Sequence, residues 1–74
     1  MNKYALGNNI RDTLDDLGKT QTWLAEDSGI TVNYISKIVC GRNMPTAVYL
    51  YKIARSLGVS MDMLMEGVVS EQNG

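Results

Sequence analysis

The sequence has few of the residue types from which metal sites and enzyme active sites are built. Histidine is absent, and cysteine occurs once, at Cys40. A structural zinc site needs several Cys or His ligands, and a disulfide needs two cysteines, so both are excluded within the chain. The chain also has no phosphate-cradling glycine loop, and so small a protein offers little room for a cleft. We therefore predict no enzyme activity, no cofactor and no small-molecule ligand.

Long apolar runs are also missing. No stretch approaches the roughly 18 consecutive apolar residues of a membrane helix, and the first ten residues lack the apolar core of a signal peptide. A lone cysteine is compatible with a reducing compartment. We expect a cytoplasmic protein with no membrane partner.

The 74 residues and 45% hydrophobic content suit one small globular domain. No internal repeat is present, and no useful stretch alternates with the period of two that marks a strand. Apolar residues recur instead at spacings of three and four, which predicts an all-α fold of five helices. We expect one domain over residues 1–69 and a polar tail over residues 70–74.

Hydroxyl side chains and glycines mark the expected helix ends. The first helix is predicted over about 6–17, where Gly18 ends it and the apolar stripe consists of Leu6, Ile10, Leu14 and Leu17. The later helices are each preceded by a residue whose hydroxyl can accept a hydrogen bond from a first-turn amide. These four N-caps are Thr20, Thr31, Thr46 and Ser60.

The segment 20–41 predicts two short helices joined by a tight turn. Gly29 can adopt positive φ, so it ends the first helix and lets the chain bend sharply. Ala25 is small enough to let two helices cross closely. The second helix, from about Val32 to Cys40, combines a polar side with apolar residues at helical spacing, namely Val32, Ile35, Ile38 and Val39.

The charge is unevenly distributed, although the net charge is only −1. Residues 1–27 contain three basic and five acidic residues, and residues 61–74 contain three acidic residues. Residues 28–60 contain four basic residues and no acidic residue: Lys37, Arg42, Lys52 and Arg55. The basic block begins at the turn of the two-helix segment and includes its second helix, where a phosphate-facing surface would lie.

The two-helix segment resembles the helix-turn-helix of the lambda-repressor-like (Cro-like, XRE) family. The resemblance rests on the spacing of Gln21, Ala25, Gly29, Ile35, Ile38 and Gly41. Residues 50–67 are similar to the last two helices of that family, so the resemblance covers roughly residues 6–67. It implies a five-helix DNA-binding domain whose helices 2 and 3 form the helix-turn-helix. It also implies a transcriptional regulator, a repressor, that binds double-stranded DNA at a palindromic operator.

In this family the second helix of the motif enters the major groove. The resemblance assigns base reading to Thr31, Val32, Asn33 and Lys37. The chemistry agrees, because Asn can pair with an adenine edge and Lys can donate to guanine, while methyl groups can pack on thymine. The expected contacts to the DNA backbone are Gln21, Tyr34, Arg42 and Asn43. We assign Lys52 and Arg55, on the expected fourth helix, to solvent.

Three positions depart from the family pattern. The family usually has Glu at the position of Val39, paired with a basic residue at the position of Leu14. Both charges are absent here, so we predict a direct Leu14–Val39 contact. Trp23 replaces a Glu that would complete a capping box, and we expect it to be a lid on a neighbouring side chain, with a contact surface as the alternative. Cys40 is expected to be a small residue at a helix end.

The C-terminal methionines exceed what one side of a short helix can bury. Met suits adaptable contact surfaces, and the last helix of this family often forms a two-fold interface. We therefore predict a homodimer through Met61, Met63, Met65 and Val68, with a well-packed C-terminus as the alternative. A second functional class also remains open, because the acidic pI of about 5.1, Trp23 and the methionines suit a protein-interaction module. An antitoxin-type partner-binding domain, in which DNA contact is secondary, is an example.

Overall fold

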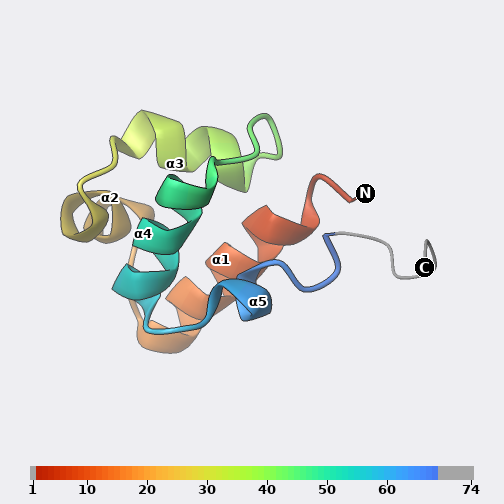
Figure 1. Cartoon of the computed structure of the whole chain (residues 1–74). Coiled ribbons are helices and arrows are strands. Elements are labelled where there is room, and N and C mark those ends of the chain that lie inside the picture. The colour runs from red at the N-terminus through yellow and green to blue at the C-terminus, as the bar shows by residue number, and fades with distance from the viewer. Residues whose placement is uncertain (1, 69–74) are drawn as a thin grey trace.

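The computed structural model describes residues 2–68, and this range contains five helices and no strand (Figure 1). The helices are α1 (Ala5–Leu17), α2 (Gln21–Ser28), α3 (Val32–Val39), α4 (Ala47–Leu57) and α5 (Met61–Leu64). The predicted all-α fold of five helices is confirmed. The tail expected over residues 70–74 lies outside the described residues.

Side-chain N-caps begin four of the five helices. The hydroxyl of Thr20 accepts a hydrogen bond from the Trp23 amide at 3.0 Å, and that of Thr31 accepts one from the Tyr34 amide at 3.2 Å. Thr46 and Ser60 make the equivalent bonds at 3.3 and 3.1 Å. All four predicted caps are therefore confirmed, and each satisfies an amide that the helix itself leaves unpaired.

Glycines in the left-handed region end three of the helices. Gly18, Gly29 and Gly58 follow α1, α2 and α4 with φ angles of 68°, 77° and 74°. The glycine stops predicted at Gly18 and Gly29 are confirmed. The link between α2 and α3 is only three residues long and begins with Gly29, so the two helices are held close together.

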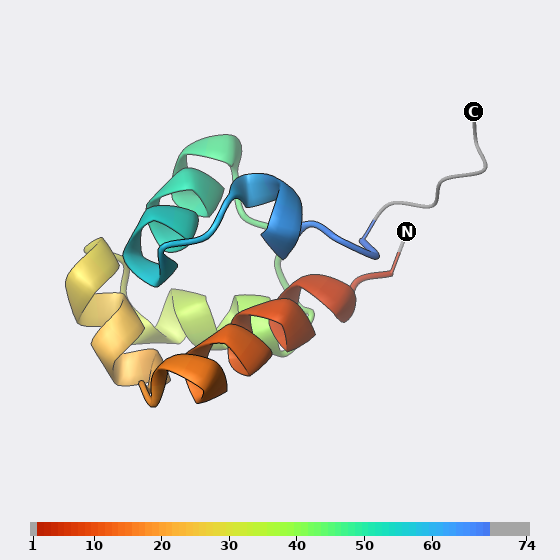
Figure 2. The same ribbon diagram turned by 90° about the horizontal axis from the view of Figure 1, so that it is seen from below.

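The helices pack so that α3 lies against both α1 and α2, while α4 covers α2 and α5. The short helix α5 closes the bundle by contacting α1 and α4 (Figures 1 and 2). One hydrophobic core fills the space between them. Its buried members are Leu6, Ile10, Leu14, Leu24, Ala25, Ile30, Ile35, Ile38, Val39, Leu50, Ile53, Ala54, Leu57, Leu64 and Val68.

The prediction that Leu17 belongs to the apolar stripe of α1 was wrong, because 46% of its surface is exposed. It is the last residue of a thirteen-residue helix that packs on the eight-residue helix α3. At 1.5 Å per residue the shorter helix cannot cover the full length of α1. The other three stripe residues, Leu6, Ile10 and Leu14, are buried as predicted.

Helices α1 and α3 approach each other closely at Gly7. A Cβ atom on this glycine would lie 2.8 Å from the Cα of Val39 and closer still to its carbonyl oxygen. Val39 therefore faces Gly7, two helical turns before Leu14. Leu14 and Val39 are members of the same core, and the direct contact between their side chains stays a prediction.

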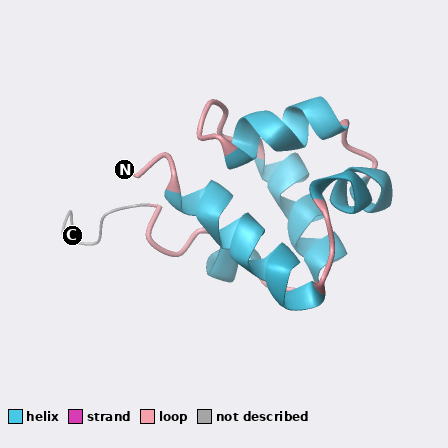
Figure 3. Cartoon of the chain, turned by 180° about the vertical axis from the view of Figure 1, so that it is seen from behind, coloured by secondary structure: helices cyan, strands magenta, loops and turns pink. Residues whose placement is uncertain are grey.

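The two ends of the described chain meet beside α1. The Asn2 amide donates to the Val68 carbonyl at 2.8 Å. One turn into α1, the amide group of Asn9 donates to the carbonyls of Leu64 and Glu66 at 2.7 and 2.9 Å. These bonds tie the segment after α5 to α1, and both chain ends leave from the same side of the bundle (Figure 3).

Candidate nucleic-acid interface

The predicted base-reading residues lie at the N-cap and on the exposed part of α3. Thr31, Val32, Asn33 and Lys37 are all exposed, and 47% of the Val32 surface is accessible. Ile35, Ile38 and Val39 on the opposite side are buried in the core. Asn33 and Lys37 are four residues apart, so their side chains lie on one side of the helix, one turn apart. Asn33 and Lys37 thus form a polar, partly cationic surface that takes no part in the packing of the core.

Tyr34 differs from the other predicted DNA contacts because its ring packs onto α4. The rings of Tyr34 and Tyr49 meet edge to face, with centroids 4.9 Å apart and planes at 81°. This geometry is one that aromatic pairs prefer. Tyr34 is half-buried, so it holds α3 against α4 in addition to any contact that it makes with DNA.

Gln21 is the first residue of α2 and is partly exposed. The first-turn amides and the helix dipole make this end of a helix favourable for a phosphate. Gln21 thus lies at the helix end that favours an anion, and its contact to the DNA backbone stays a prediction.

The loop after α3 is fixed by hydrogen bonds to the last turn of the helix. The carbonyl of Lys37 accepts from the amides of Arg42 and Asn43 at 2.8 and 3.3 Å, and the Ile38 carbonyl accepts from the Gly41 amide at 3.0 Å. The side chains of Arg42 and Asn43 are exposed. They are thus presented to solvent from a loop whose backbone is tied to α3.

Trp23 lies beside Lys19, which belongs to the link between α1 and α2. Its side chain is half-buried and packs against the core, and the Lys19 ammonium group lies 5.2 Å from the ring centroid. A cation at this distance over an indole ring is attracted to it. The ring thus packs between the core and Lys19, which agrees with a lid, and the role of Trp23 stays a prediction.

The predicted dimer surface needs one correction. Val68 is fully buried within the chain, with 0% exposure, because the segment after α5 folds back onto α1. Met61 and Met65 are partly buried against the core, whereas Met63 has 60% of its surface exposed. Met63 is therefore the methionine of α5 that is most available to a partner.

Among residues 2–68 the structure contains no cluster of three or more potential metal ligands. No helix in this range is long and apolar enough to cross a membrane. Sequence reasoning missed Gly7 and Asn9, which fix the position of α1 against α3 and α5. A glycine inside an otherwise regular apolar stripe was the one available signal for Gly7, and no local pattern pointed to Asn9.

A capped helix, a turn through a left-handed glycine and a second helix with a polar outer side define a helix-turn-helix protein. Residues 10–64 match the helix-turn-helix family HTH_3. The chain belongs to this family, and it is a DNA-binding transcriptional regulator rather than an enzyme.

Relatives and solved structures share this architecture. The uncharacterized HTH-type transcriptional regulator y4dJ of Sinorhizobium fredii (strain NBRC 101917 / NGR234) is 36% identical over 55 residues, which cover 74% of this chain and 71% of that protein. The crystal structure of the clp gene regulator ClgR from Corynebacterium glutamicum is similar with a TM-score of 0.78 and 33% identity, over 95% of each chain. The NMR structure of the DNA-binding domain of the P22 c2 repressor gives a TM-score of 0.81 and 27% identity, over 99% of this chain and 96% of that one.

Proposed function

We propose that the protein is a cytoplasmic repressor that binds a palindromic operator as a homodimer, with α3 in the major groove. The observation that carries this proposal is the exposure of Thr31, Val32 and Asn33 at the start of α3 and of Lys37 one turn after Asn33, while Ile35, Ile38 and Val39 of the same helix are buried. In a protein of net charge −1, specific base contacts have to compensate for weak nonspecific attraction to DNA. A cytoplasmic location follows from the proposed DNA partner.

The proposed contacts fall into two groups. Thr31, Val32, Asn33 and Lys37 read base edges. Gln21 at the start of α2, the loop residues Arg42 and Asn43, and the exposed part of Tyr34 hold the DNA backbone. Backbone contacts fix the register of the protein on the duplex without specifying sequence.

The proposed dimer uses the exposed side of α5, centred on Met63 with the accessible parts of Met61 and Met65. Two-fold symmetry of the protein would match two-fold symmetry of the operator. Sedimentation at tens of micromolar, with and without DNA, measures the assembly. Met63→Asp is expected to shift the population toward monomer, and Asp12→Asn, an exposed position on α1, is the matched control. A wild-type protein that is monomeric under all these conditions would exclude the homodimer.

In vitro selection from random-sequence duplexes at physiological salt tests the function itself, because nonspecific electrostatic binding is weakened there. We expect enrichment of a palindrome whose half-sites lie about one helical turn apart. Absence of enrichment by folded protein would instead favour the protein-interaction module. That outcome would direct attention to the exposed apolar side chains Val48, Tyr51 and Met63.

A further inference from the structure

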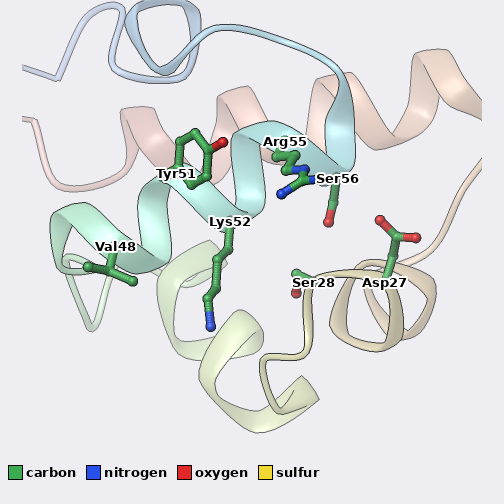
Figure 4. Close-up of a pocket in the computed structure, with 7 residues that line it drawn as sticks. All are labelled: Asp27, Ser28, Val48, Tyr51, Lys52, Arg55 and Ser56. Atoms are coloured by element: carbon green, nitrogen blue, oxygen red, sulfur yellow. The ribbon is translucent and has the colours of Figure 1, made fainter.

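Helix α4 contains two of the four basic residues of the acid-free block, Lys52 and Arg55, and the structure separates them. Both line a shallow hollow between α4 and the end of α2. Figure 4 shows the Lys52 side chain extended along the α3 side of this hollow, away from Asp27. The Arg55 side chain lies at the other end, beside Ser56. Only Lys52 therefore approaches the helix that is proposed to enter the groove.

Two aromatic rings define how close Lys52 lies to α3. Its ammonium group is 5.8 Å from the ring centroid of Tyr49, a distance at which a cation is attracted to the ring face. The Tyr49 ring in turn contacts the ring of Tyr34, which belongs to the first turn of α3. The ring of Tyr49 thus lies between the Lys52 ammonium group and the ring of Tyr34, so Lys52 is placed beside the N-terminal turn of α3.

The dimensions of DNA indicate what this position can contact. A helix with its side chains is about 10–12 Å across, and the major groove is about 12 Å wide. A helix inside the groove therefore fills its width, and a group displaced sideways by one aromatic ring lies over the edge of the groove. The phosphates follow that edge.

We infer that Lys52 is a further contact to the DNA backbone, held in place by Tyr49, and that the interface extends from α3 onto the second turn of α4. This inference rests on the proposed function, because it assumes that α3 enters the major groove. It revises the assignment of Lys52 to solvent and retains that assignment for Arg55. Lys52 contributes affinity for any duplex, and no choice of base.

Salt dependence measures such a contact directly. Each phosphate that a cation neutralises contributes about −0.9 to the slope of log Kobs against log salt concentration for duplex DNA. Binding to a fluorescein-labelled duplex of mixed sequence is followed by anisotropy between about 50 and 200 mM salt. We expect the slope for Lys52→Gln to be less steep than that of the wild type by about 0.9. Lys52→Arg keeps the wild-type slope, because it keeps the charge.

Arg55→Gln is the matched control, since it removes one exposed positive charge from the same helix and leaves the Tyr49 contact intact. Equal slopes for Lys52→Gln and Arg55→Gln would overturn the inference, and so would an altered base preference of Lys52→Gln in selection. Failure of the wild type to bind any duplex would overturn the proposed function instead. Circular dichroism of each variant confirms that the helices are retained.

Discussion

Gly7 of α1 and Val39 of α3 are in backbone contact, and no side chain separates them. The absence of a Cβ atom on Gly7 allows the Val39 carbonyl to approach the helix backbone. Glycine inside a helix costs about 0.5–1 kcal/mol relative to alanine. At Gly7 this lower helix propensity accompanies the close packing of α1 on α3. The distance between α1 and α3 depends on this glycine.

Replacing Gly7 by alanine tests this relationship. Overpacking a core costs about 1–3 kcal/mol, and here the new methyl group meets backbone atoms that cannot rotate away. We expect Gly7→Ala to lower the free energy of unfolding by about 2 kcal/mol despite its better helix propensity. Urea denaturation followed by circular dichroism measures the change, with the exposed substitution Asp12→Ala as control. A more stable Gly7→Ala variant would show that the helices can separate without cost.

Asn9 is expected to be the main polar tie between α1 and the segment after α5. Asn9→Asp keeps the shape but removes both N–H donors, and it places a carboxylate oxygen against the carbonyls of Leu64 and Glu66. Leaving such partners unsatisfied costs about 1–3 kcal/mol, and we expect a loss near 2 kcal/mol. Asn8→Asp is the matched control, because Asn8 is exposed and only accepts a hydrogen bond, from Arg11. Thermal unfolding should show a lower midpoint for Asn9→Asp alone.

Truncation of Val68 and truncation of Met63 should change the free energy of unfolding by different amounts, although both residues belong to the predicted dimer surface. Val68 is completely buried, and full burial of a valine side chain contributes about 1.5–3 kcal/mol. Val68→Ala is therefore expected to lower the free energy of unfolding by about 2 kcal/mol. Met63→Ala, at an exposed position, should remain within about 0.5 kcal/mol in dilute solution. Similar losses for the two variants would contradict this division of roles.

Asn33 and Gln21 should affect DNA binding differently. Asn33→Ala is expected to relax base preference at one operator position, where a bidentate contact gives about 1–3 kcal/mol of discrimination. Gln21→Ala is expected to weaken binding to all sequences alike, because a backbone contact does not depend on the base. Repeating the selection with each variant measures both effects. A uniform loss from Asn33→Ala would remove it from the base-reading set.

The sequence predicted the parts of this fold that depend on local chemistry. The caps at Thr20 and Thr31 and the turn at Gly29 each involve atoms within four residues, and the resemblance to a known family supplied the order of the helices. Leu17 was assigned to the core wrongly, because periodicity does not show where a partner helix ends.

Contacts between distant segments were not accessible in the same way. The bonds from Asn9 to the segment after α5 join residues more than 50 positions apart. The Tyr34–Tyr49 pair depends on how α4 crosses α3, which no local pattern records. For the candidate site, the four residues assigned to base reading are exposed as expected. The position of Lys52 beside α3 depends on its contact with Tyr49, which the sequence does not show.

The hydrogen bond between Asn2 and Val68 also determines where anything attached to this protein would be. The two ends of the described chain leave from one corner, at the opposite end of the bundle from the first turn of α3 (Figure 1). A fluorophore or a surface tether attached at Asn2 would project from that corner. Such a label would leave the N-terminal turn of α3 free to approach a duplex, but it would lie near the loop that contains Arg42 and Asn43, because Gly41 of that loop borders Lys3 and Tyr4.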